Sequence, residues 1–134
     1  MKVIAAKWLA VFSLIELRSI QNHIHRLVKI LREVILNAHH PQVQFLCDFF
    51  HEQIAEGNLI EKLKKNIGLV GLVHIADVPG RHEPGTGEIN YENIFKTLGQ
   101  LHFSHYAAME YLPTYDAVAS LRTEREKALK AGRV

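Results

Sequence analysis

The chain has 134 residues, of which 48% are hydrophobic and 22% are charged, a length and composition typical of a single domain with a sizeable core. Its net charge of +2 comes from interspersed acidic and basic residues, which argues against nucleic acid or a membrane surface as a partner. Cys47 is the only cysteine, so an internal disulfide framework is excluded and a reducing, cytoplasmic location is favoured.

Apolar runs alternate with amphipathic stretches along the chain, the pattern of βα units and a parallel sheet. The first predicted strand lies within residues 9–16, and the helix after it spans residues 20–36, where apolar residues recur at helical spacing. The apolar start of the chain is too short for a membrane span, and no signal-peptide cleavage pattern follows it. We therefore assign it to the first of about four βα units.

Three further units follow in the same order of strand and helix. One helix begins at Asn58, which we expect to cap it, with Glu61 in the capping-box position. Another begins at Asn90, with Ile89 and Ile94 in the two positions of a hydrophobic staple. The strands are predicted at residues 43–49, 69–76 and 106–111, and the last helix at residues 114–129.

Polar residues stand near the carboxyl ends of these three strands, where a buried parallel sheet tolerates a charge only if it is paired or bound to a metal. Asp48, His74 and Glu110 are 26 and 36 residues apart, close to one βα repeat of roughly 30 residues each time. We therefore expect them on one rim, where carboxylates and an imidazole suit Mg²⁺, Mn²⁺ or Zn²⁺. Glu16, which ends the first strand, is a fourth candidate ligand.

Each of these residues also has an ordinary structural interpretation. His74 could be a hydrogen-bonded core histidine, Asp48 could cap a helix or pair with a lysine, and Glu110 could lie at a sheet edge. Their common position at strand ends supports a metal site about as well as it supports these structural interpretations, which stay open.

The string VHIADVPGRHEPGTGEINY, together with CDFFHEQIAEGNLI before it and AAMEYLP after it, resembles the hydroxypyruvate isomerases of the xylose-isomerase-like barrel superfamily. The resemblance extends over residues 45–118, whereas residues 1–41 match poorly. It implies an α/β fold with parallel strands, a partial (β/α)₈ TIM barrel. Residues 1–134 would then form one domain, the C-terminal half of such a barrel.

The resemblance implies a metal-assisted interconversion of hydroxypyruvate and tartronate semialdehyde, by proton transfer through an enediolate. It implies that a divalent metal is bound by Asp48, His74, Glu110 and Glu16, and that Glu110 and Glu16 are the catalytic acid/base pair. Two features depart from the family pattern. Hydroxypyruvate isomerases often carry glutamine where His74 stands, and the segment LIELRS around Glu16 lacks the family's proline and asparagine.

The loop between the strand at residues 69–76 and Asn90 is rich in proline and glycine, and the resemblance implies that it contributes to substrate binding. His51 and Arg81 match positions that contact substrate oxygens in relatives, and Arg81 would bind a substrate carboxylate with two hydrogen bonds. His82 and Glu83 either contact the substrate or only tie the loop together.

Two other functions stay open. The chain could be a related 2-oxo-sugar-acid isomerase or epimerase, or a truncated, non-catalytic remnant or interaction module of the fold. Four parallel strands alone leave both edges of the sheet unpaired, so we expect self-association or pairing with a missing half-barrel. The small hydroxy-oxo acid substrate is the other expected partner.

Overall fold

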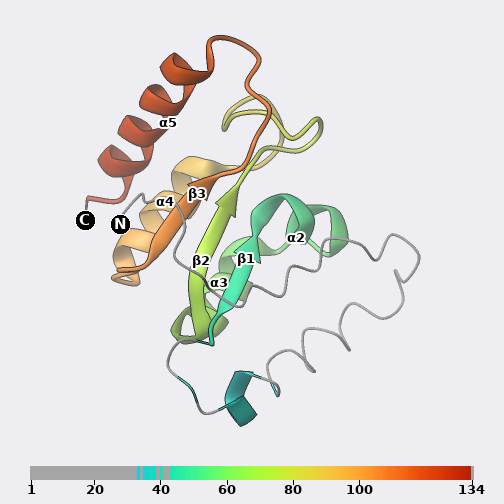
Figure 1. Cartoon of the computed structure of the whole chain (residues 1–134), viewed down its shortest axis with the longest axis vertical. Coiled ribbons are helices and arrows are strands. Elements are labelled where there is room, and N and C mark those ends of the chain that lie inside the picture. Colours follow the sequence, from blue (N-terminus) through green and yellow to red (C-terminus); the bar gives the residue numbers. More distant parts are fainter. Residues whose placement is uncertain (1–32, 34, 39, 41–42, 134) are drawn as a thin grey trace.

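The computed structural model describes residues 33, 35–38, 40 and 43–133. The strand predicted at residues 9–16, including Glu16, and most of the helix predicted at residues 20–36 lie outside the described residues. The described elements are β1 (Phe45–Asp48), α2 (Phe49–Ala55), α3 (Leu59–Asn66), the 3-10 helix η1 (Ile67–Leu69), β2 (Val70–Ile75), α4 (Tyr91–Gln100), β3 (Tyr106–Met109) and α5 (Ala117–Ala131) (Figure 1).

The strands form one parallel sheet in the order β1-β2-β3, as the alternating pattern predicted. Each strand falls inside its predicted range and is shorter than predicted. Asp48 is the register partner of His74, and His74 is the partner of Ala108 on β3. Since side chains two residues apart share a face of a strand, Glu110 follows Ala108 on the same face as Asp48 and His74.

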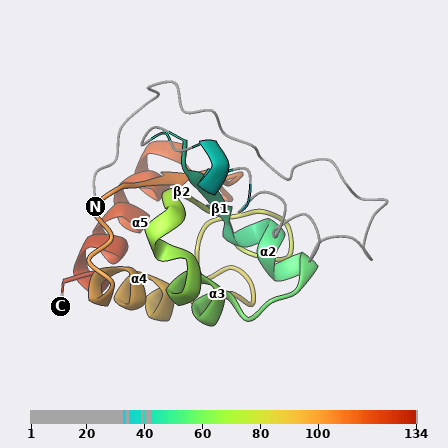
Figure 2. The ribbon, with the colours of Figure 1, turned by 90° about the horizontal axis from the view of Figure 1, so that it is seen from below.

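The sheet has one face covered by helices and one face that carries the polar residues. Val73 and Ile75 are fully buried in a core with apolar residues of α3, α4 and α5, and Figure 2 shows α3 and α4 side by side on one side of the sheet. His74, between them in the strand, points to the opposite side because successive side chains alternate.

The helix α2 was not predicted, since residues 49–55 follow the strand without a turn signal. Asp48 is its N-cap: the Oδ1 atom accepts hydrogen bonds from the backbone N–H groups of Phe50 and His51. Asp48 therefore ends β1 and also caps α2. The capping alternative for Asp48 is observed, and it uses only one of the two carboxylate oxygens.

The other helix starts agree with the sequence in part. The predicted helix start at Asn90 is confirmed, and the Asn90 side chain caps α4 by accepting from the N–H of Asn93. The capping prediction for Asn58 was wrong, because this residue adopts a left-handed conformation with φ of 53° and makes no side-chain capping hydrogen bond. The last helix is capped by Asp116 and begins at Ala117, later than predicted.

None of the helices in the described part of the chain is both long and apolar enough to cross a membrane.

Candidate functional site

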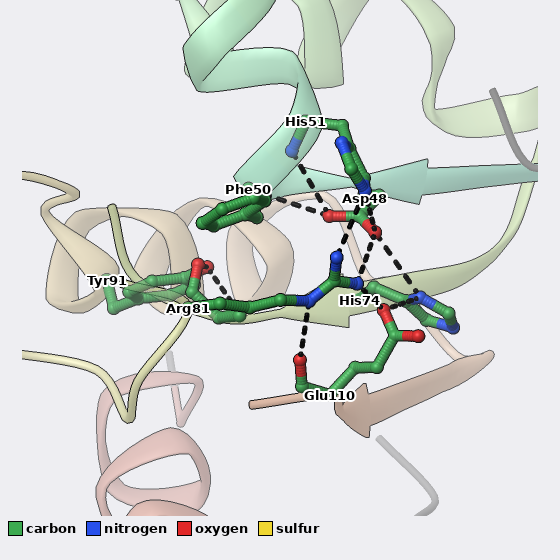
Figure 3. Close-up of polar contacts among 8 residues, drawn as sticks. Asp48, Phe50, His51, His74, Arg81, Tyr91 and Glu110 are labelled. Atoms are coloured by element: carbon green, nitrogen blue, oxygen red, sulfur yellow. Dashed lines mark hydrogen bonds and ion pairs between the residues drawn. The ribbon is translucent and has the colours of Figure 1, made fainter. Parts of the chain in front are cut away.

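Asp48, His74 and Glu110 come together at the carboxyl ends of three adjacent strands. Each offers one potential ligand atom, and these three atoms all lie within 4.8 Å of one another. His74 Nδ1 is 2.7 Å from Glu110 Oε2 and 3.5 Å from Asp48 Oδ2 (Figure 3). Strand register explains this convergence, because it sets the three residues on one face at one edge of the sheet.

The three side chains differ in their exposure to solvent. Asp48 and His74 are 7% and 14% exposed, whereas Glu110, one residue beyond β3, is 40% exposed. The backbone N–H of Glu110 donates to the carbonyl of Ile75, so the residue is held by β2 at its main chain and presents its carboxylate at the open side of the cluster.

Two atoms of the cluster are buried without a hydrogen-bond partner of acceptable geometry, namely Asp48 Oδ2 and His74 Nδ1. Both are close to the neighbouring ligand atoms, yet their directions do not suit hydrogen bonds among them. A buried polar atom without a partner is costly, so a group that binds both atoms is favoured. The donor set of two carboxylates and one imidazole suits a divalent cation.

The electrostatics of the cluster follow from its mutual contacts. Burial alone would raise the pKa of Asp48, but the contact with His74 brings it below its ordinary value. Burial alone would lower the pKa of His74, but its contacts with Asp48 and the negative charge of Glu110 raise it. The contact between His74 and Asp48 thus favours the charged form of each partner.

Arg81 brings a second positive charge to the same place. Its Nη2 lies 2.5 Å from Glu110 Oε2 and 3.6 Å from Asp48 Oδ2, and its Nε donates to the Glu110 carbonyl. Its Nη1 donates to His51 Nε2 over 3.2 Å, and the guanidinium carbon lies 5.0 Å from the centre of the Phe50 ring (Figure 3). Arg81 and His51 therefore lie beside the cluster of Asp48, His74 and Glu110, and both face it.

The loop that carries Arg81 is tied to the segment after β3. Glu83 is buried, and its carboxylate accepts hydrogen bonds from the N–H and the hydroxyl of Thr114. His82 Nδ1 donates to the carbonyl of Leu112, whose own N–H donates to the carbonyl of Arg81. His82 and Glu83 thus tie the loop together, which was one of the two alternatives left open by the sequence.

A family model described as the xylose isomerase-like TIM barrel matches residues 16–132 of the chain. The chain belongs to this family. The three parallel strands with their helices are accordingly part of an α/β barrel. The match includes Glu16, the predicted acid/base partner of Glu110, although the position of Glu16 lies outside the described residues.

Named isomerases resemble the chain over part of their length. The 2-oxo-tetronate isomerase of Pectobacterium atrosepticum is 44% identical over 54% of this chain and 28% of its own length. The hydroxypyruvate isomerase of Escherichia coli is 39% identical over 56% of this chain and 29% of its own length. The chain spans about a third of the length of the curated relatives that it matches.

A solved structure of the AP endonuclease, family 2, from Brucella melitensis has the same arrangement of elements. It aligns with a TM-score of 0.65 at 30% identity, over 71% of this chain and 37% of that protein. The fold predicted from the alternating pattern and from the resemblance is thus confirmed by sequence and structure comparisons together.

Two residues of this barrel site were not singled out from the sequence. Phe50 stacks beneath the Arg81 guanidinium, and Asp77 lies buried at the start of the Arg81 loop. Phe50 could have been found from its place between Asp48 and His51. Asp77 had a weaker signal, an acid directly between a buried strand and a glycine-rich loop.

Proposed function

We propose that the chain contributes to a metal-assisted isomerase of small hydroxy-oxo acids, which interconverts hydroxypyruvate and tartronate semialdehyde. The observation that carries this proposal is the convergence of Asp48, His74 and Glu110 to within 4.8 Å, with Arg81 beside them. Membership of the xylose isomerase-like family and similarity to isomerases of this kind support it.

In this proposal a divalent cation, Mg²⁺, Mn²⁺ or Zn²⁺, would be held by Asp48, His74 and Glu110, with Glu16 as a further ligand. When bound, the ion would supply positive charge that stabilises the negative charge developing on the substrate oxygens during proton removal. Asp48 is suited to its part because Oδ1 is already fixed by the cap of α2, which aims Oδ2 at the cluster.

Arg81 and His51 would bind the substrate. A guanidinium matches a carboxylate with two parallel hydrogen bonds, and the substrates proposed here each have a carboxylate. In the structure Arg81 Nη2 donates a hydrogen bond to Glu110 Oε2, so one of its donors is already in use. A substrate carboxylate on Arg81 would compete with Glu110 and free the Glu110 carboxylate for proton transfer.

Glu110 and Glu16 would form the acid/base pair that moves the proton between neighbouring carbons. Glu110 has the exposure needed to reach a substrate, since its side chain is 40% exposed at the open side of the cluster. The contribution of Glu16 is carried only by the resemblance.

A second candidate is an isomerase or epimerase of a longer 2-oxo acid, because a 2-oxo-tetronate isomerase is 44% identical over its matched segment. His74 favours this candidate too, since the resemblance associates hydroxypyruvate isomerases with glutamine at this position. Nuclease activity is disfavoured, because the charged residues of the chain are mixed in sign and the net charge is only +2.

The described sheet has β1 and β3 at its two edges, and the chain spans about a third of its relatives' length. We propose that the active form is a self-associated chain or a chain paired with another half-barrel. If neither assembly occurs, the third function, a non-catalytic remnant or interaction module, is favoured.

The test measures turnover of hydroxypyruvate and of 2-oxo-tetronate by NMR, after removal of metals with a chelator and after addition of Mn²⁺, with light scattering on the same samples. We expect turnover that requires Mn²⁺ and an assembled form, and its loss in Glu110→Gln. The control is Glu61→Gln, which changes an exposed glutamate on α3 that pairs with Lys64. A monomer that melts cooperatively and converts neither acid would contradict the proposal.

A further inference from the structure

Asp77 is a buried carboxylate that has no part in the metal-ligand cluster. It comes two residues after the end of β2, behind Ala76, and has no exposed surface. Among the described residues it makes no ion pair with a lysine, arginine or histidine. A buried carboxylate without a cation needs several hydrogen-bond donors to be tolerated.

Four backbone N–H groups of the following loop supply these donors. Asp77 Oδ1 accepts from Val78 at 2.9 Å and from Ile89 at 3.0 Å, and Oδ2 accepts from Gly85 at 2.9 Å and from Gly87 at 3.0 Å. One side chain therefore joins the beginning, the middle and the end of the loop.

The main chain of Asp77 binds the part of the loop that carries Arg81. The Arg81 N–H donates to the Asp77 carbonyl at 3.0 Å, and the Asp77 N–H donates to the His82 carbonyl at 2.8 Å. Arg81 itself has φ of 58°, a left-handed conformation that is unfavourable for a residue with a side chain and needs support from its surroundings. The hydrogen bonds of Asp77 on both sides of Arg81 give this support.

The loop leaves little room for another arrangement. A Cβ atom at Gly87 would collide with the Val78 carbonyl and lie 2.7 Å from Asp77 Oδ1. Gly85 has φ of 92°, a conformation that glycine adopts without strain. Gly85 and Gly87 therefore both suit the loop conformation in which their N–H groups donate to Asp77 Oδ2.

We propose that Asp77 is a positioning residue that holds the Arg81 guanidinium in place for the carboxylate of the substrate. The identity of the substrate rests on the proposed function. The new assignment is the role of Asp77, a residue that touches neither metal nor substrate. Asp77 acts through the backbone of residues 78–89, and Arg81 makes the contact.

An Asp77→Asn variant tests this role with little change in shape. An amide has one acceptor oxygen, and its NH₂ group would face two N–H donors where the carboxylate accepted from both. We expect the loop to rearrange around the two backbone N–H groups that lose their acceptor. A matched control is Asp116→Asn, the same exchange at the exposed cap of α5, where asparagine caps as well as aspartate.

Two measurements separate positioning from a general effect on stability. The first is the Nε–H signal of Arg81 in ¹H–¹⁵N NMR spectra, identified by its absence in Arg81→Lys, since this group donates to the Glu110 carbonyl in the structure. The second is the kinetics on hydroxypyruvate with Mn²⁺. We expect Asp77→Asn to shift or broaden the Nε–H signal and to raise KM about tenfold or more while kcat changes less than about threefold.

Asp116→Asn should alter neither quantity. An unchanged Arg81 signal and an unchanged KM in folded Asp77→Asn would overturn the inference, as would a fall in kcat alone. If the unaltered protein converts no hydroxypyruvate, the proposed function fails, and the Arg81 signal alone then decides whether Asp77 positions the guanidinium.

If Asp77→Asn does not fold, Gly85→Ala replaces it as the test. An added Cβ at Gly85 meets no atom within 4 Å, but its φ is unfavourable for alanine, so the Gly85–Asp77 hydrogen bond is weakened without a collision. We expect a smaller change of the same kind in the Arg81 signal and in KM. A folded Gly85→Ala protein with both unchanged would overturn the inference.

Discussion

Tyr91→Phe removes a single buried hydroxyl group that binds the end of β2. The Tyr91 hydroxyl accepts from the Ala76 N–H at 3.0 Å and donates to the Ala76 carbonyl at 2.7 Å. Tyr91 and Ala76 are 4% and 1% exposed, so water cannot readily replace the lost partner. The ring contacts with Phe49 and Phe95 are kept by phenylalanine, which confines the change to the two hydrogen bonds.

The expected loss follows from the two backbone groups left without a partner. Each unsatisfied buried group costs about 1–3 kcal/mol, so Tyr91→Phe should lower the free energy of unfolding by about 2–6 kcal/mol. With a urea m-value of about 2 kcal/mol/M, the unfolding midpoint should fall by about 1–3 M. For a chain of this size, in which 1 kcal/mol shifts the melting temperature by about 4 °C, the melting temperature should fall by roughly 8–24 °C.

Urea unfolding followed by circular dichroism measures this loss directly. The control is Tyr115→Phe, which removes a hydroxyl from a side chain that is 46% exposed and should change stability by less than about 0.5 kcal/mol. If Tyr91→Phe is no more destabilising than Tyr115→Phe, then the hydroxyl does not anchor Ala76 and the reasoning is refuted.

Two further predictions concern the metal cluster and the loop. His74→Ala should weaken Mn²⁺ binding, measured by calorimetry, by about tenfold or more, because even partners outside the ligand set typically contribute that much; unchanged affinity would exclude His74 as a ligand. The hydrogen bonds from Thr114 lower the pKa of Glu83 below its ordinary value of 4.5. Ionised Glu83 therefore stabilises the folded protein at pH values above 4.5, and this stabilisation is lost as the pH falls through the pKa of the folded state. Glu83→Gln should therefore flatten the decline of the melting temperature between about pH 6 and pH 3, and an unaltered pH profile would contradict this account.

The rim of the site was predictable because parallel strands impose a strict geometry. A strand end in the sequence becomes a position on one edge of the sheet, so Asp48, His74 and Glu110 could be grouped from their spacing alone. Which face they share is also fixed by the two-residue period of a strand. The prediction needed no knowledge of how any single side chain packs.

The helix α2 was missed for the opposite reason. Residues 49–55 carry no cap signal other than Asp48 itself, which had been assigned to the strand. One residue that ends a strand and caps a helix leaves no loop for a sequence pattern to reveal. At Asn58 the converse happened, because a good capping residue adopts a left-handed turn and its side chain makes no capping hydrogen bond.

The loop of residues 77–90 has neither helix nor strand, yet its backbone N–H groups still need acceptors. Asp77 and Glu83, both buried, supply acceptors within the loop and toward the segment after β3. These contacts join residues that are between 8 and 31 positions apart in the sequence, which is why no local pattern predicted them. Their effect is to leave the Arg81 side chain free to face the cluster, while His82 is used to bind the Leu112 carbonyl. The many polar residues in this one stretch are thus explained by a division of tasks. Buried acids supply the hydrogen-bond acceptors that secondary structure would otherwise supply, and they hold one arginine in an unfavourable conformation beside Asp48, His74 and Glu110.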